Sequence, residues 1–436
     1  MDPPHQRGFD NQPPEQISAR EATRLLGVKT QTLYSYVSRG WVRSTPAARG
    51  NERLYVRADV ERLKARGQAR AGHAAVAAGA LRWGEPILST SISTIRDVGP
   101  VYRGHAATDL VRQGASFESV AELLWSGALD LDARGWKGRW KGHSAAKAMQ
   151  SVGGVVTRGR TPLEGLLAVV PRLALLDVDR FAAPSEAEWA RARRLIRTLV
   201  AVLGERVGPD VPSRAAGEET VAGAMAVALG ASSGRARAAV NGALVLLADH
   251  ELNASTFAAR VVASTGADLY ACLTGALAAS TGPLHGGASD RVEALLDEVG
   301  APARAREVLQ SRASRGDAIP GFGHKLYPEG DPRAVALMET ARALSGRSDR
   351  MGRSDRMGRS DRMATVLAVA DAMAGGGREP PNVDFALVAL ARALDLPRGA
   401  AAALFVMGRT AGWVAHALEQ RQAGYLLRPR AEYVGP

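Results

Sequence analysis

Apolar residues recur at helical spacing through most of the chain. A stretch with strand propensity, residues 87–95, precedes an amphipathic helix that ends at Gly127. From there to about residue 281 one helical pattern follows another, because apolar side chains three and four positions apart share one face of a helix. Turn-forming residues interrupt the pattern at Pro171, Pro184, 204–212, 230–234 and 249–255. The pattern predicts an all-α body with little sheet.

The N-terminal segment has a pattern of its own. Ser18 can cap a first helix that Gly27 ends, and Thr30 can cap a second one over residues 31–38. Two short helices joined by a glycine-containing turn are typical of a helix-turn-helix. A small hairpin or wing and a third helix from Asp59 complete the predicted unit.

Composition sets the limits of these units. Residues 1–14 are polar and contain proline, without the apolar core of a secretory signal, so we expect a disordered tail. Residues 67–82 are rich in Ala, Gly and Arg and predict a linker. The linker separates the N-terminal unit, 15–66, from the helical body, which begins at about residue 83.

Charge and cysteine content limit the classes of partner and of chemistry that the chain can have. The net charge of +12, in a chain where Arg outnumbers Lys, favours nucleic acid, carboxylates or a phosphorylated cofactor. Cys272 is the only cysteine, so we expect no intrachain disulfide and no thiolate metal cluster, and its apolar surroundings favour inert packing. No run of about 18 apolar residues occurs, which argues against a membrane span and for a cytoplasmic protein.

A hexapeptide, Gly-Arg-Ser-Asp-Arg-Met, stands three times in succession over residues 346–363. A period of six matches neither the helical repeat nor the length of a solenoid repeat. The repeat therefore predicts a surface loop, with helical patterning resuming at Ala364, and the alternative is a basic loop beside an anionic ligand.

Three histidines lie in loops rich in turn formers. His285 lies in Gly-Pro-Leu-His-Gly-Gly, His250 in Asp-His-Glu-Leu-Asn and His324 in Pro-Gly-Phe-Gly-His. Such loops let backbone and side chain approach a ligand closely, so these histidines are candidate catalytic residues. His143 and His416 lie in helical patterns, and we expect them to be structural or solvated.

One aspartate and several arginines extend the candidate set. Asp384 precedes an apolar run and, taken alone, is expected to be a helix N-cap. Arg409 differs from most arginines of the chain. Trp413, His416 and Gln420 follow it on one face of a small-residue helix, which predicts a partly buried guanidinium that needs an anionic partner.

Together these residues indicate a class of chemistry. The chain has no Ser-His-Asp spacing, no phosphate-cradling glycine loop and no metal-ligand spacing. Loop histidines, an aspartate and arginines indicate proton transfer on a carboxylate substrate.

Residues 15–66 resemble the winged helix-turn-helix domains of the MerR and excisionase type, through Ile-Ser-Ala-Arg-Glu-Ala from Ile17, Leu-Gly-Val from Leu26 and Thr-Leu-Tyr from Thr32. The resemblance implies that the second helix enters the major groove of DNA and that the wing meets phosphates. The residues it would bring to DNA are Gln31, Thr32 and Tyr34 at the bases and Arg39, Arg43, Arg49 and Arg53 at the backbone. The alternative is a domain kept for folding or oligomer contacts.

The remainder, from about residue 83 to residue 436, resembles the citrate synthase family through six motifs in the family's order. They are His-Glu-Leu-Asn-Ala-Ser-Thr-Phe from His250, Gly-Pro-Leu-His-Gly-Gly around His285, Gly-Phe-Gly-His with Asp-Pro-Arg around His324 and Arg333, Asn-Val-Asp at Asp384, Gly-Arg-Thr-Ala-Gly-Trp at Arg409 and Arg-Pro-Arg from Arg428. The resemblance implies an α-helical homodimer with a large domain, 83–281 and 385–436, and a small domain, 282–384. The hexapeptide repeat and the helix-turn-helix unit depart from the family's usual pattern.

The resemblance also implies an acyltransferase that condenses acetyl-CoA with oxaloacetate and hydrolyses citryl-CoA to citrate and CoA. Asp384 would take a proton from the acetyl group, His285 would donate a hydrogen bond to the thioester oxygen, and His324 would polarise the ketone. The residues implied to hold the carboxylates are His250, Arg333, Arg409 and the partner subunit's Arg428. The resemblance implies no metal and no permanently bound cofactor, since acetyl-CoA is a substrate.

Two alternatives stay open from the sequence. The sequence does not determine the size of the acyl pocket, so propionyl-CoA as substrate and 2-methylcitrate as product fit the same motifs. The other alternative is a regulator that senses oxaloacetate or acyl-CoA and presents two helix-turn-helix units to DNA. The retained aspartate argues against a pure sensor, because a sensor has no use for a catalytic base.

Overall fold

The structure of the protein is a computed structural model. It describes residues 16–39, 41–46, 53–57, 59–61, 63, 88–133, 135–136, 154, 161–181, 185–345, 353–429, 433 and 435, with the backbone alone at 185 and 353–361. The chain divides into two compact units, Met1–Ser89 with Arg428–Pro436, and Thr90–Leu427. The predicted tail, 1–14, the predicted linker, 67–82, and Arg49, His143 and Pro184 lie outside the described residues.

The first unit packs short helices on a small antiparallel sheet. Its elements are β1 (Gln16–Ser18), α1 (Ala19–Leu26), α2 (Thr30–Ser38), β2 (Ser44–Pro46) and β3 (Arg53–Val56), with the strand order β1-β3-β2. As predicted, the Ser18 side chain accepts a hydrogen bond from the Glu21 amide and Gly27 ends α1 in a left-handed conformation. The prediction that Thr30 caps α2 is wrong, because the helix already begins at Thr30 and Lys29 precedes it without a side-chain cap.

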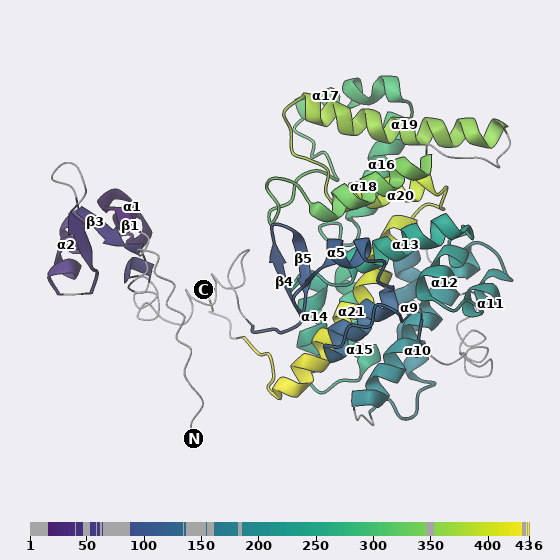
Figure 1. Ribbon diagram of the computed structural model, residues 1–436, viewed down its shortest axis with the longest axis horizontal. Coiled ribbons are helices and arrows are strands. Elements are labelled where there is room, and N and C mark those ends of the chain that lie inside the picture. Colours follow the sequence, from purple (N-terminus) through teal and green to yellow (C-terminus); the bar gives the residue numbers. More distant parts are fainter. Residues whose placement is uncertain are drawn as a thin grey trace. The chain divides into compact units, whose positions relative to one another are not determined.

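The second unit is mostly helical, as predicted (Figure 1). A three-stranded antiparallel sheet comes first, with β4 (Ser93–Arg96), β5 (Gly99–Tyr102) and β6 (His105–Ala106) in that order. The helices that follow are α5 (Ala107–Arg112), α6 (Phe117–Ser126), α9 (Pro162–Ala174), α10 (Ser185–Leu203), η1 (Gly204–Arg206), α11 (Val211–Ala216), α12 (Val221–Ala228), α13 (Gly234–Leu247), α14 (Ala254–Ser264), α15 (Leu269–Ser280), α16 (Ala288–Val299), η2 (Pro302–Arg304), α17 (Ala305–Ser314), α18 (Pro332–Ser345), α19 (Arg353–Gly375), α20 (Val383–Ala393) and α21 (Ala400–Ala423).

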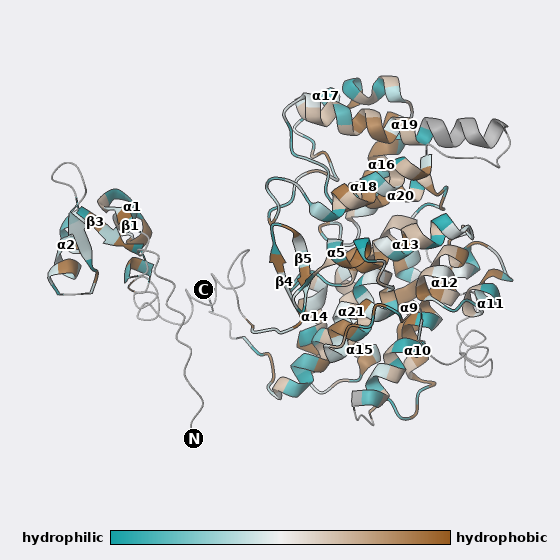
Figure 2. Ribbon diagram, viewed as in Figure 1, coloured by the Kyte–Doolittle hydropathy of each residue, from teal (hydrophilic) through white to brown (hydrophobic). Residues whose placement is uncertain are grey.

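Helix α21 is the buried centre of this unit, and residues 400–417 are all buried. Its many Ala and Gly residues let other helices approach closely. A Cβ atom at Gly408 would lie 2.7 Å from the Leu247 Cβ, and one at Gly412 would collide with the Asp249 carboxylate. The end of α13 and the loop after it therefore pack directly on α21. In Figure 2 the apolar residues concentrate toward the middle of the unit, and polar residues lie mostly at outer turns.

Most of the predicted helix breaks are present. Helices end just before or within 204–212, 230–234 and 249–255, and the next α-helix begins inside each range. The break predicted at Pro171 is wrong, since this proline lies inside α9, close to its end. Proline in a helix costs about 3 kcal/mol. Burial of apolar neighbours such as Val169 and Val170 offsets this cost, because each fully buried side chain of that kind contributes roughly 1.5–3 kcal/mol.

The loop predicted for the hexapeptide repeat is wrong for residues 353–363, which belong to α19. Met363, Val366, Val369 and Met373 are buried on one side of that helix. Once such packing has formed a helix, extending it costs little, because nucleation is the expensive step. The remaining repeat residues, 346–352, lie outside the described part. None of the described helices has the length and apolar run that a membrane crossing needs.

Candidate active site

The loop before His324 and the turn before Asp384 are hydrogen-bonded to each other. The Asn382 amide donates to the Gly321 carbonyl at 2.9 Å, and Asn382 Nδ2 donates to the Gly323 carbonyl at 3.0 Å. Gly321 has a φ of +90°, and a Cβ there would lie 2.8 Å from a Val292 methyl, so this close approach requires glycine. The two candidate residues therefore stand on one connected piece of backbone.

Asp384 is not the N-cap of its helix, so that prediction is wrong. Asn382, two residues earlier, caps α20 by accepting from the amides of Asp384 and Phe385. The Asp384 carboxylate is thus left for another purpose, and it accepts a 2.8 Å hydrogen bond from the Ser289 hydroxyl. Burial raises the pKa of Asp384 to about 6, although the bond from Ser289 opposes the rise. A carboxylate with a raised pKa is a stronger base than an ordinary one.

His324 has a defined tautomer. Its Nδ1 accepts a hydrogen bond of 3.1 Å from the Leu326 amide. Burial, with the charge of Arg333, lowers the pKa of His324 to about 4, so the ring is neutral at pH 7. A neutral ring that accepts at Nδ1 carries its proton at Nε2. Nε2 is therefore a hydrogen-bond donor.

His250 lies between α13 and α14, beside His324. The two ring centroids are 5.5 Å apart, and His250 Nε2 is 2.9 Å from the Tyr327 hydroxyl. Burial, followed by the charges of Arg333 and Arg409, holds the pKa of His250 well below its usual value. Glu251, the next residue, has a φ of +55°. Strained backbone of this kind is often found at functional sites.

His285 lies in the turn between α15 and α16. A Cβ at Gly286 would lie 2.5 Å from the Ser280 carbonyl oxygen, so only glycine lets the turn fold back this tightly. The His285 Nε2 is 2.8 Å from the Ser255 hydroxyl. Burial, with the charge of Arg409, lowers the pKa of His285 to about 4. This imidazole is also neutral at pH 7.

The Ser255 hydroxyl connects His285 to α21. It accepts from Trp413 Nε1 at 3.1 Å and donates to the Asn253 side-chain oxygen at 2.7 Å. Its single proton can point either to Asn253 or to His285 Nε2. That choice decides whether the other nitrogen of His285 donates or accepts a hydrogen bond.

Arg333 is a buried cation with a permanent partner. Its Nε and Nη2 donate to the two oxygens of Asp331 at 2.9 and 2.8 Å. The Asp331 carboxylate also accepts from the Val383 amide at 3.2 Å, which ties the start of α18 to the start of α20. The Arg333 guanidinium lies 5.5 Å from the ring centre of Tyr327.

Arg409 is the second buried cation, and its burial agrees with the sequence prediction. It is 1% exposed, and burial lowers its pKa to about 10, still far above neutrality. Among the described residues, Arg409 Nε and Nη1 have no hydrogen-bond partner. The guanidinium lies 5.1 Å from the centre of the Phe405 ring, which also contacts His285 edge-on. A buried arginine with two such donors is suited to binding a carboxylate.

The structure thus brings most of the predicted residues together. His250, His324 and Arg333 all contact Tyr327, and the charge of Arg409 acts on His250, His285 and Asp384. Arg428 falls outside the unit that contains them, and it is exposed.

Sequence reasoning missed several residues of this region: Asp249, Ser255, Ser289, Tyr327 and Asp331. Ser255 and Asp331 lie within two of the quoted motifs, so motif position was an available signal. Tyr327 and Ser289 follow candidate histidines by three and four residues, a spacing that carries no chemical meaning in loops. Cys272 is buried and its pKa is raised to about 11 by burial, which suits packing.

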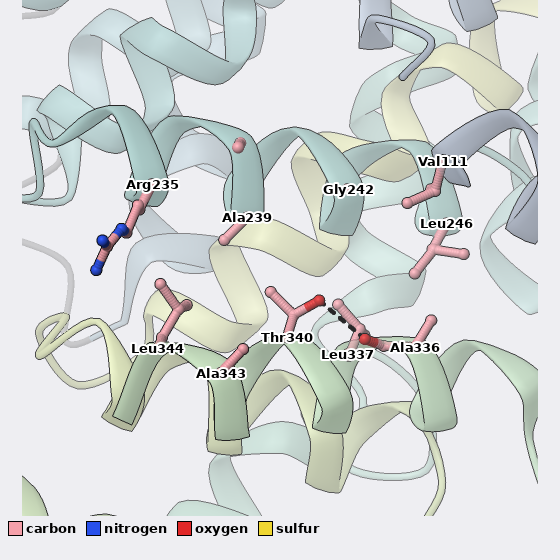
Figure 3. A pocket seen from close by; sticks show the side chains of 11 residues that line it. Val111, Arg235, Ala239, Gly242, Leu246, Ala336, Leu337, Thr340, Ala343 and Leu344 are labelled. Carbon is pink, nitrogen blue, oxygen red and sulfur yellow. Dashed lines mark hydrogen bonds between the residues drawn. The ribbon is translucent and has the colours of Figure 1, made fainter. Parts of the chain in front are cut away.

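A separate cavity of about 410 Å³ lies between α13 and α18 (Figure 3). Its lining includes Arg235, Gly242, Leu246, Thr340 and Leu344 and none of the candidate catalytic residues. Among the described residues, no group of three His, Cys, Asp or Glu side chains could hold a metal ion.

Comparison with known proteins gives the family. Residues 80–430 match the family model described as "Citrate synthase, C-terminal domain". The chain is 33% identical over 360 residues to Citrate synthase 2 of Bacillus subtilis, covering 80% of this chain and 93% of that protein. It is 33% identical over 340 residues to 2-methylcitrate synthase of Mycobacterium tuberculosis, covering 77% and 84%.

A solved structure agrees with the sequence relatives. The ternary complex of citrate synthase from Thermoplasma acidophilum with carboxymethyl coenzyme A and oxaloacetate matches with a TM-score of 0.65 and 26% identity, over 80% of this chain and 94% of that one. The fold and the site therefore define an acyl-transferring enzyme. The chain belongs to the citrate synthase family.

Proposed function

We propose that the protein is a citrate synthase that condenses acetyl-CoA with oxaloacetate and hydrolyses citryl-CoA to citrate and CoA. The observation that carries this proposal is the presence of a base, Asp384, together with a buried arginine, Arg409, whose charge acts on it. Among the described residues, Arg409 Nε and Nη1 have no hydrogen-bond partner and can bind a substrate. Three neutral histidines accompany them. Family membership and the solved relative with oxaloacetate and a CoA analogue support the same substrates.

The first step is proton transfer from the acetyl methyl group to Asp384. The enolate that forms is far more basic than a carboxylate, so it needs stabilisation as it develops. His285 supplies this by donating from Nδ1 to the thioester oxygen. For that, the Ser255 proton must turn from the Asn253 oxygen to His285 Nε2, while Trp413 Nε1 holds the Ser255 oxygen in place.

The second step forms the carbon–carbon bond. His324 donates from Nε2 to the ketone oxygen of oxaloacetate, which makes the ketone carbon electrophilic. As the enolate carbon attacks, that oxygen takes the His324 Nε2 proton, and the proton that Asp384 removed from the methyl group is returned to His324 through solvent, so both residues regain their starting states. Arg409, Arg333 and His250 hold the carboxylates, with the partner subunit's Arg428 in a homodimer. Each hydrogen bond to a charged group contributes roughly 1.5–3 kcal/mol. Water then cleaves the thioester and releases the CoA thiol.

A two-domain arrangement, with the small domain at 282–384, would let the site exclude water until the hydrolytic step. The first candidate histidine of that segment, His285, hydrogen-bonds Ser255 of the proposed large domain. A domain movement would therefore act directly on this catalytic contact.

The experiment is thiol release by the full-length protein with acetyl-CoA, in the presence and absence of oxaloacetate. The proposal expects release that depends on oxaloacetate, with citrate as the product. Release of equal rate without oxaloacetate would indicate a simple thioesterase and contradict the proposal.

A second acyl donor, propionyl-CoA, is favoured by the relative named 2-methylcitrate synthase, which is as similar in identity as the named citrate synthase. The same thiol assay distinguishes them through the ratio of kcat/KM for the two donors. A ratio above about ten for propionyl-CoA would assign the 2-methylcitrate reaction; one extra methylene in a pocket is worth roughly 10–200-fold.

We also propose that residues 15–66 form a winged helix-turn-helix that binds DNA. The three-residue connection between α1 and α2, the sheet β1-β3-β2 and the 54% exposure of Tyr34 support it. Arg43 is bound by Asp59 at 2.8 and 3.1 Å, and Arg53 by Ser44 at 3.0 Å, so these arginines would also shape the wing. A gel shift of the full chain on its upstream DNA over a salt series tests this. Loss of sequence preference at physiological salt would leave a structural role only.

A further inference from the structure

Helix α21, which carries Arg409, packs against a buried carboxylate, Asp249, that does not bind the unpaired Arg409 donors. Asp249 is fully buried, and its charge and that of Arg409 influence each other. A side chain at Gly412, one turn after Arg409 in α21, would collide with Asp249 Oδ1. Within the described part of the chain, Oδ1 also has no hydrogen-bond partner. Two complementary buried groups thus lie near each other without forming the expected ion pair.

The hydrogen bonds to the other Asp249 oxygen explain why this ion pair does not form. Oδ2 accepts from the Ser93 hydroxyl, from the Glu251 amide at 3.1 Å and from His416 Nε2 at 3.3 Å. Three donors, from β4, from the loop between α13 and α14 and from α21, converge on this one atom. The carboxylate therefore cannot rotate without breaking several buried hydrogen bonds, each costly to leave unmade.

His416 is itself fixed by a buried cation. Arg260 Nε donates to His416 Nδ1 at 3.0 Å, so the histidine carries its proton at Nε2 and donates it to Asp249. Arg260 also donates to Gln420 Oε1 at 3.1 Å and is paired with Glu419. The chain of contacts runs from Arg260 through His416 to Asp249, without touching Arg409.

Arg333 shows the pairing that Arg409 lacks. Its neighbouring carboxylate, Asp331, forms a two-point ion pair with it. Asp249 would be expected to do the same with Arg409 if it could turn. We propose that Ser93 and His416 are positioning residues that hold Asp249 away from Arg409, so that the Arg409 donors stay available for a substrate carboxylate.

This inference rests on the proposed function, in which Arg409 binds oxaloacetate. The test measures the dissociation constant of oxaloacetate by calorimetry in full-length variants. His416→Phe frees Asp249 to pair with Arg409, so oxaloacetate binding should weaken roughly ten-fold, about the effect of losing one hydrogen bond to a charged group. The KM for acyl-CoA should stay unchanged.

The decisive variant adds Asp249→Asn to His416→Phe. An amide cannot form the competing ion pair, so the double variant should recover oxaloacetate binding to within about three-fold of the wild type. Failure to recover would overturn the proposal, because loss of a merely structural histidine is not repaired by neutralising a neighbour. His416→Gln, whose amide can accept from Arg260 and donate to Asp249, should bind as the wild type does.

A milder variant keeps the proposal testable if His416→Phe fails to fold. Ser93→Ala removes one donor to Asp249 Oδ2 without opening a large cavity, and it should weaken oxaloacetate binding in the same direction, with recovery by Asp249→Asn. A crystal structure of either loosened variant should show Asp249 within about 3.2 Å of an Arg409 nitrogen. An unmoved Asp249 would refute the inference. If the wild type binds oxaloacetate but releases no thiol, the proposed reaction fails while these comparisons still decide the role of Asp249.

Discussion

Ser289 donates a hydrogen bond of 2.8 Å to the carboxylate of Asp384. This bond favours the charged form of Asp384, whereas burial favours the neutral form and raises the pKa to about 6. The balance between the two sets the pH at which Asp384 becomes a base. It therefore makes the acid limb of the activity profile predictable.

Removing the hydroxyl with Ser289→Ala should raise the pKa of Asp384 further. The expected rise is roughly one unit, since a hydrogen bond to a charged group contributes about 1.5–3 kcal/mol and one unit corresponds to 1.4. The acid limb of kcat/KM for acyl-CoA should move to higher pH by that amount. Ser314→Ala, at an exposed serine of α17, is the control and should leave the limb in place. An unchanged limb in Ser289→Ala would mean that another group controls it.

Asp384→Asn should make the protein more stable at neutral pH. The pKa of Asp384 is raised in the folded state, so its charged form costs stability as pH rises through about 6 and the cost is absent below the unfolded value of 3.8. The rise from 3.8 to about 6 is about 2.2 units, so the variant should gain up to about 3 kcal/mol in unfolding free energy at pH 8 and nothing at pH 3.5. Chemical unfolding at the two pH values measures this. Equal effects at both would show that the gain has no electrostatic origin.

Asp331→Asn should be strongly destabilising. It leaves Arg333, which is 2% exposed, without its ion-pair partner and weakens the contact with the Val383 amide. Breaking a buried pair costs about 3–5 kcal/mol. Asp317→Asn breaks the exposed pair with Arg315 and should cost under about 1 kcal/mol. Thermal unfolding of the two variants side by side gives the comparison, and similar losses would argue that the Asp331 pair is not effectively buried.

Ser255→Ala should lower kcat more than it changes binding. The substitution removes the atom that His285 Nε2 and Trp413 Nε1 share, so the imidazole loses its orientation toward the thioester oxygen. We expect a fall in kcat of about 10–100-fold, less than the roughly 100–10,000-fold that a general acid–base group contributes, because Ser255 orients His285 and does not itself transfer the proton. The KM for oxaloacetate should change little. A rise in that KM with kcat preserved would place Ser255 in substrate binding.

Patterns along the chain predicted the helical body and the burial of Arg409, because both depend on local spacing. The N-cap of α20 was mispredicted because Asn382 and Asp384 are both good cap residues, and only the backbone path selects the first. The hexapeptide residues 353–363 and Pro171 were mispredicted because packing of neighbouring apolar residues overrides local preference. The roles of Asp249 and His416 depend on contacts between elements more than 150 positions apart, which no local pattern reports.

The most direct test of the proposed reaction is thiol release from acetyl-CoA by the wild type and by Asp384→Asn, with oxaloacetate present. We predict rapid release by the wild type and a loss of at least about a thousand-fold in kcat for the variant, because Asp384 is the proposed base and an amide cannot take the proton. Oxaloacetate binding to the variant should be preserved. Wild-type-like release by Asp384→Asn would contradict the central claim.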